Sequence, residues 1–203
     1  MSNAVRIDSR DLAEVKALLN RLDGDETNKA MARGINATLP GVRTDGVRIL
    51  SEHYALTASA IRESWKIRKA LFRDPFGVVS TQGTFIRLAR FGAKQTKTGV
   101  SVKVLKKNPR AVIEHAFLAR AKKRQREEQV YWRKYKGPRK SPVRGRAYAK
   151  MEFLYRFPIE ALYGPRVQDK FDDPGVMGTV QNLAAERLTK NMAREVDSIL
   201  RGH

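Results

Sequence analysis

The sequence predicts an α+β protein in which N-terminal and C-terminal helices pack on an antiparallel β-sheet of about four to six strands. Near both ends of the chain, apolar residues recur every three or four positions, which is typical of amphipathic helices. In the middle of the chain, apolar and polar residues alternate over short runs, which predicts strands. The connections between these runs are too short for helical crossovers, so neighbouring strands are expected to be antiparallel.

The N-terminal third of the chain is predicted to be helical. Residues 8–22 have one apolar face preceded by good N-cap residues. Residues 26–53 carry a longer apolar stripe that Pro40 interrupts, so we expect a kinked helix or two helices there. A short third helix is expected around residues 57–63, with Thr57 as its cap.

Five segments in the middle of the chain are predicted to be strands. They are residues 65–71, 77–81, 85–91, 99–105 and 111–119. Alternation is cleanest in the fourth segment, where three valines point to one side and Ser101 and Lys103 to the other. Asn108-Pro109 supplies a turn after it, so the fourth and fifth segments are expected to pair.

The last third combines a loop and a helix. Residues 120–150 are expected to form a long basic loop between two strands, and residues 151–159 return to apolar and aromatic character. A C-terminal helix is predicted over residues 175–200, because Asp173 can cap it and Pro174 suits its first position.

The chain is expected to fold as one domain built from three regions. They are a helical N-terminal region at 1–64, the sheet with its basic excursion at 65–160, and a C-terminal segment with its helix at 161–203. A length of 203 residues and an apolar fraction of 41% are sufficient for such a core.

The positive charge is confined to the middle of the chain. Residues 61–160 hold 27 Lys/Arg against 7 Asp/Glu, whereas residues 1–60 hold 8 of each and residues 161–203 hold 6 of each. A basic block between two neutral flanks predicts a surface that faces a polyanion; the plainer alternative is a solubilising face or a basic loop. The candidate nucleic-acid-facing residues are Lys94, Lys97, Lys103, Lys106, Lys107, Arg120, Lys122, Lys123, Arg124, Arg126, Arg133, Lys134, Arg139 and Lys140.

The sequence offers little for catalysis, and we expect neither an enzyme nor a bound metal or cofactor. The three histidines are far apart, and His115 is expected in the middle of a strand, in a structural role. The chain has no cysteine, no P-loop motif and no dinucleotide-binding glycine turn. Glu114 with Glu152 or Glu160 would be the carboxylates of a metal-dependent nuclease, but their spacing does not favour one.

Four aromatic residues lie among the lysines and arginines of the basic loop: Tyr131, Trp132, Tyr135 and Tyr148. Aromatic rings between basic residues can stack on the bases of a single strand, or they can dock a loop on a sheet. Since no RNA-binding strand motif accompanies them, docking is the favoured interpretation.

Several short segments, in their order along the chain, resemble a known family. They are residues 30–38 (AMARGINAT), 61–70 (IRESWKIRKA), 87–91 (RLARF), 99–104 (GVSVKV), 116–119 (AFLA) and 157–167 (FPIEALYGPRV). The most specific piece consists of Pro158, Ile159, Leu162, Tyr163, Gly164 and Pro165. Over about residues 25–200 the chain resembles the minor tail protein Z family of long-tailed bacteriophages and prophages, also described as tail completion proteins. The loop at 120–150 is longer and more basic than this resemblance leads one to expect.

The resemblance implies a structural virion protein that completes the head-proximal end of the tail and aids head–tail joining near the DNA end. The expected partners are other tail or connector proteins, sister copies in a ring, and duplex DNA contacted without sequence specificity. The alternative is a non-catalytic nucleic-acid-binding module that uses the basic block 61–160. With no signal core and no apolar run long enough to span a membrane, we expect assembly in the host cytoplasm, residence in the virion tail and no membrane partner.

Overall fold

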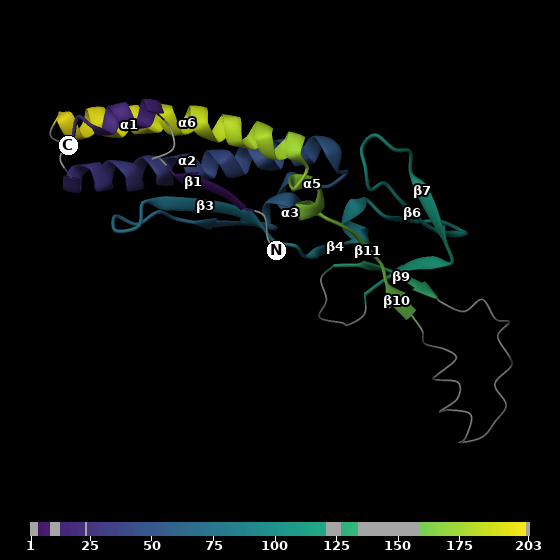
Figure 1. The fold of residues 1–203 in the computed structure, drawn as a ribbon. Coiled ribbons are helices and arrows are strands. Elements are labelled where there is room, and N and C mark those ends of the chain that lie inside the picture. The colour runs from purple at the N-terminus through teal and green to yellow at the C-terminus, as the bar shows by residue number, and fades with distance from the viewer. Residues whose placement is uncertain (1–3, 9–12, 23, 121–126, 134–158, 202–203) are drawn as a thin grey trace, which may run out of the picture. The chain divides into compact units, whose positions relative to one another are not determined.

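The computed structural model describes residues 4–8, 13–22, 24–120, 127–133 and 159–201. The chain divides into two compact units. We call them the helical unit (residues 1–53, 57–84 and 166–203) and the strand unit (residues 54–56 and 85–165), and Figure 1 shows their elements. The predicted α+β class, with antiparallel sheets and helices at both ends of the chain, is confirmed.

Two long helices dominate the helical unit. Helix α2 (Gly24–His53) and helix α6 (Pro174–Leu200) run antiparallel, with the short helix α1 (Ala13–Leu19) beside α6 (Figure 1). The two long helices approach closely at Gly34, where a Cβ atom would collide with the side chain of Met192. Each helix buries one apolar stripe, as amphipathic spacing requires.

Helix α2 continues through Pro40 without a break, so of the two predicted alternatives, a kinked helix or two helices, the second is wrong. Pro40 is exposed and lacks the N–H that would bond one turn back. Its neighbours Leu39 and Val42 are 1% and 0% exposed. Their burial stabilises the continuous helix more than the missing hydrogen bond destabilises it.

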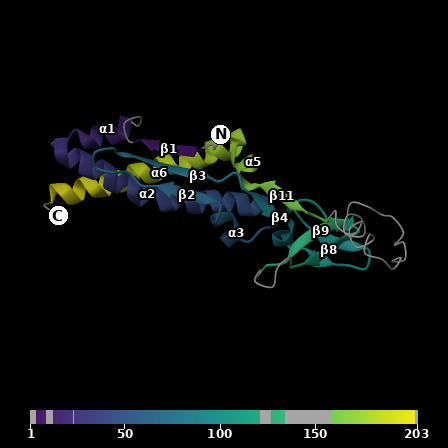
Figure 2. The ribbon, with the colours of Figure 1, turned by 90° about the horizontal axis from the view of Figure 1, so that it is seen from below.

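A three-stranded antiparallel sheet packs along α2. Its order is β1 (Ala4–Asp8), β3 (Phe76–Thr81) and β2 (Trp65–Arg68), and Figure 2 shows β3 between the other two. Val79 of β3 pairs with Val5 on one side and with Ile67 on the other. Strand β1 was not predicted from the sequence, because an alternation over five residues gives a weak periodic signal. Its last residue, Asp8, is the first residue of the predicted helix 8–22, within which α1 lies.

Helices α3 (Ala58–Arg62) and α6 begin as their sequences predict. Thr57 caps α3 by accepting a hydrogen bond from the Ala60 amide at 3.3 Å. Asp173 caps α6 by accepting one from the Gly175 amide at 3.0 Å, with Pro174 at the first helical position. Helix α5 (Val167–Phe171) precedes α6 and was not predicted from the sequence.

The strand unit contains small sheets instead of one sheet of four to six strands. Among the described residues these sheets are β5-β6-β7, β8-β9-β10 and β4-β11. The bounds are β4 (Phe85–Arg87), β5 (Lys94–Gln95), β6 (Gly99–Val102), β7 (Ala111–Glu114), β8 (Ala116–Ala119), β9 (Gln129–Arg133), β10 (Ile159–Ala161) and β11 (Tyr163–Arg166). Strand β9 lies inside the predicted basic loop.

One left-handed residue divides a predicted strand, and a 3₁₀ helix that ends at a second left-handed residue shortens another. His115, with φ of 61°, separates β7 from β8, so the predicted strand 111–119 is two strands and His115 is not in the middle of one. Gly92, with φ of 63°, ends the 3₁₀ helix η2 (Leu88–Phe91), which replaces the second half of the predicted strand 85–91. A positive φ redirects the chain and ends a β-ladder.

No helix among the described residues is both long enough and apolar enough to cross a bilayer.

Candidate polyanion interface

Five of the predicted nucleic-acid-facing lysines lie on one small sheet of the strand unit and its connections. Lys94 lies in β5 opposite Ser101 of β6, and Lys97 lies in the turn between these strands. The connection from β6 to β7 carries the other three, Lys103, Lys106 and Lys107. Lys103 is half-buried and the other four are exposed. The β5-β6-β7 sheet and its connections therefore carry five of the predicted cations.

The alternation predicted for β6 gives this sheet two different faces. Val100 and Val102 are 0% and 4% exposed, whereas Ser101 between them faces the other side. Lys94 and Val112 are the cross-strand neighbours of Ser101, so they share its face, and Val112 is 49% exposed. One face of the sheet thus contributes to the core of the strand unit, and the other carries charge toward solvent.

Sequence reasoning misses Arg110, which lies on the same sheet. Its Nε donates a hydrogen bond to the Ser101 hydroxyl at 3.0 Å. Its Nη2 donates to the Ser101 carbonyl at 2.9 Å and also to the Gly92 carbonyl. These bonds fix the guanidinium in place. The signal that could reveal Arg110 is its position just before β7, where a long side chain reaches across the hairpin.

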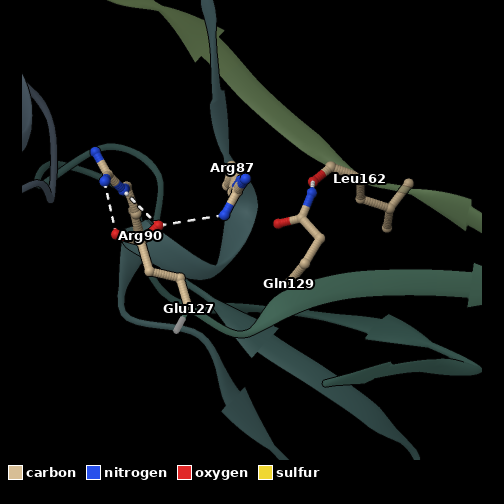
Figure 3. A network of polar contacts seen from close by, with 5 residues as sticks. All are labelled: Arg87, Arg90, Glu127, Gln129 and Leu162. Atoms are coloured by element: carbon tan, nitrogen blue, oxygen red, sulfur yellow. Dashed lines mark hydrogen bonds and ion pairs between the residues drawn. The ribbon is translucent and has the colours of Figure 1, made fainter. Parts of the chain in front are cut away.

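Two arginines of the strand unit are held by one carboxylate. Arg90 Nη2 donates to Glu127 Oε1 at 2.8 Å, and Arg87 Nη1 donates to Glu127 Oε2 at 3.4 Å (Figure 3). The hydrogen bonds from Arg90, with the positive charges of both arginines, hold the pKa of Glu127 below its ordinary value. Beside them, Gln129 donates to the Leu162 carbonyl at 3.0 Å (Figure 3). This network attaches the start of β9 to η2 and offsets part of the positive charge.

The remaining predicted cations are placed less favourably. Arg120 lies 3.8 Å from Glu128, and both side chains are more than half exposed, so this ion pair contributes little. Arg133 lies in β9, with its side chain outside the described residues. Seven further predicted residues lie wholly outside them: Lys122, Lys123, Arg124, Arg126, Lys134, Arg139 and Lys140.

The segment with the most specific family resemblance is structural. Ile159 begins β10, and Leu162 bonds to β9 and η2, since its amide donates to the Val130 carbonyl at 2.8 Å and its carbonyl accepts from the Leu88 amide at 3.2 Å. Gly164 is buried against the ring of Phe91. Two other motif residues lie in β11, where Tyr163 is exposed and Pro165 is half-buried. Pro158 lies outside the described residues.

Aromatic residues of β9 contact the sheet. Tyr131 pairs with Phe117 of β8, and their rings stack with centroids 5.9 Å apart. Trp132, the next residue, is half-buried. The Tyr131 ring is therefore engaged within the strand unit, whereas Tyr135 and Tyr148 lie outside the described residues.

The described residues contain no cluster of three or more His, Cys, Asp or Glu side chains that could hold a metal ion. Glu114 and Glu160 are both exposed, in β7 and β10, and Glu152 lies outside the described residues. His115 is exposed, and its amide donates to the Thr98 carbonyl at 3.0 Å.

The positive charge follows the division into two units. The strand unit, counted over its full sequence, holds 22 Lys/Arg and 5 Asp/Glu, which gives a formal net charge of +17 out of the chain's +20. The helical unit holds 19 Lys/Arg and 16 Asp/Glu, which leaves +3. Helices and cationic sheets are thus chemically distinct parts of the molecule.

Comparison with known protein families gives a match over nearly the whole chain. The sequence model of the family described as prophage minor tail protein Z matches residues 12–203, nearly the whole chain. No curated protein and no solved structure matches the chain significantly.

Proposed function

Because this chain belongs to the prophage minor tail protein Z family, and so has a structural role in a phage tail, we propose that it completes the head-proximal end of that tail. In this role it helps to join the tail to the head, near the end of the DNA. It acts by binding and not by turnover. Its other partners are neighbouring tail or connector proteins and sister copies in a ring.

The observation that carries the proposal is the concentration of charge in the strand unit. Duplex DNA presents one negative charge per ~1.7 Å of its axis, so a protein beside the DNA end gains from a cationic surface. The cluster around β5-β6-β7 supplies such a surface in Lys94, Lys97, Lys106 and Lys107, all of them exposed. No base readout is needed, and contacts to phosphate suffice. The nearly neutral helical unit is left for contacts with proteins.

A lysogen with a deletion of this gene tests the tail role. After induction, electron microscopy is expected to show filled heads and separate tails, and supplying the wild-type gene is expected to restore joined particles. Joined, infective particles without the protein would contradict the proposal.

Two matched variants test the role of charge. Each replaces four exposed basic residues by glutamine, so both change the net charge equally. The test variant changes Lys94, Lys97, Lys106 and Lys107. The control variant changes Lys29, Arg33, Lys190 and Arg194, on α2 and α6. The test variant is expected to fail to join heads to tails, and the control variant is expected to join them normally. Equal effects of the two variants on joining would contradict the claim that the position of the charge matters.

The alternative, a nucleic-acid-binding module without a tail role, makes a different prediction. It requires tight binding of duplex DNA by the isolated chain, with log affinity falling by about 0.9 per neutralised phosphate for each log unit of salt. The tail role requires the protein to be present in purified tails, which immunogold labelling detects. DNA binding without labelling of tails would favour the alternative.

A further inference from the structure

We propose that the tip of the β2–β3 hairpin is a docking knob that inserts into an apolar pocket, rimmed by acidic side chains, on another protein of the tail. The knob consists of Leu71 and Phe72, in the helical unit. This inference rests on the tail role and adds to it the chemistry of one partner surface.

The knob is an exposed apolar pair at a turn. Leu71 is 64% exposed and Phe72 is 56% exposed. Single exposed apolar residues are common and need no explanation, but here two large side chains are adjacent in sequence and project from one hairpin. Among the described residues of the helical unit, Leu200 is the other exposed large apolar side chain.

The hairpin that carries the knob is rigidly held. Backbone hydrogen bonds of 3.0 Å join Leu71 to Asp74 in both directions. The side chain of Asn36, on α2, clamps Ala70 by accepting from its amide at 2.8 Å and donating to its carbonyl at 2.9 Å. Below the turn, Arg68 bonds to Asp74 at 3.2 Å. A segment that is ordered before binding loses little conformational entropy on binding, which suits a docking element.

The charges around the knob indicate the partner. Lys69 and Arg73 flank the two tip residues, are exposed, and have no ion pair within the described part of the chain. Arg68 is already paired with Asp74. The net surface around the apolar tip is therefore cationic, and its complement is an apolar pocket with an acidic rim.

An anionic membrane would also suit two apolar side chains within a basic collar. Membership of a tail family favours a protein partner, since a tail protein works among other tail proteins. The membrane therefore enters as an outcome of the test.

The test uses tails purified from an induced lysogen that lacks this gene. Full-length wild-type protein is added, and co-sedimentation with the tails is titrated. The variant Leu71→Ser/Phe72→Ser is expected to bind at least about 30-fold more weakly, as for loss of an interface hot spot. The matched control, Leu200→Ser, removes the other exposed large apolar side chain described in the helical unit and is expected to bind normally. Because Leu71 and Phe72 are exposed, circular dichroism and the melting temperature should stay unchanged.

Each other result overturns something specific. Normal binding by the double variant overturns the knob and leaves the tail role intact. Failure of the wild-type protein to bind these tails overturns the tail role and the knob together. If the double variant binds tails normally but no longer binds vesicles of anionic phospholipid, the hairpin contacts a membrane instead of a tail protein. Finally, a photoreactive phenylalanine analogue at position 72 should cross-link to a tail protein at a site with acidic neighbours; cross-links to lipid alone contradict the proposal.

Discussion

Replacing Gly164 by alanine tests whether the family-like segment is structural. A Cβ atom at this position would penetrate the Phe91 ring, and even two further ring atoms, Cζ and Cδ2, would lie only 2.8 and 3.0 Å away. Phe91 is fully buried, and Tyr54 packs edge-on against it with ring centroids 6.4 Å apart. Because the ring is buried and packed against Tyr54, we expect the added methyl group to distort the strand unit.

The expected cost is that of an overpacked core, about 1–3 kcal/mol. For a protein of this size, that cost lowers the melting temperature of the affected part by roughly 2–4 °C per kcal/mol. Because the chain has two units, hydrogen exchange read by mass spectrometry is the suitable assay, since it reports on each unit separately. Exchange is expected to increase in peptides from β6 and β9 and to stay unchanged in α2 and α6.

Two controls make the result specific. Gly178→Ala adds the same methyl group inside α6, where nothing lies within 4 Å, and is expected to stabilise by about 0.5–1 kcal/mol through helix propensity. Phe91→Leu in the Gly164→Ala background should recover part of the loss, with a coupling energy of about 0.5–3 kcal/mol. Unchanged exchange in Gly164→Ala would refute the steric reasoning.

Three further predictions concern polar groups. Arg187→Met should destabilise the helical unit by about 2–3 kcal/mol, because it leaves the carboxylate of Asp45, which is 4% exposed, without the hydrogen bonds of 2.7 and 3.1 Å that Arg187 donates. Asp45→Asn should destabilise it by less, because Arg187 is exposed and can regain water. Thermal melts measure both losses of stability, and a larger loss in Asp45→Asn would refute this reasoning. Thr57→Ala should cost about 1 kcal/mol, measured by hydrogen exchange in α3, with Thr57→Ser as the neutral control. Glu127→Gln should destabilise the strand unit at neutral pH. The difference in stability from wild type should disappear as the pH falls below about 4.5, because the pKa of Glu127 is lowered in the folded state and the stabilisation by its charge is lost on protonation. A difference in stability that is independent of pH would contradict the role of this charge.

The parts of the fold that could be predicted are those with long periodic patterns or good caps. The apolar stripe of α6 and its Asp173-Pro174 start predict this helix almost to the residue, and Thr57 predicts α3. The buried valines of β6 follow from simple alternation. In each case local preference and tertiary burial agree, which is the condition under which sequence reasoning works.

The parts that could not be predicted depend on contacts between distant segments. The left-handed backbone of His115 splits a segment whose composition favours one continuous strand. The continuity of α2 through Pro40 depends on burial that helix propensity does not include. For the candidate interface, the sequence predicts the five lysines that lie on β5-β6-β7 and its connections but misses Arg110, because the hydrogen bonds of its guanidinium to Ser101 and Gly92 exist only once the hairpin has formed.

The concentration of charge in the strand unit carries a physical cost that supports a binding role. Like charges repel, so a unit with +17 is destabilised by its own field, more so because its sheets are small and its core depends on close packing such as that of Gly164 on Phe91. At the start of β9, Glu127 relieves part of this repulsion through its ion pairs with Arg87 and Arg90. A polyanion bound to the folded unit would remove the remaining repulsion and stabilise the fold by mass action, by about 2.7 kcal/mol at a concentration 100 times its Kd. The helical unit, nearly neutral and stabilised by the packing of α2 on α6, needs no such partner. This asymmetry is expected of a protein that meets nucleic acid with one unit and proteins with the other.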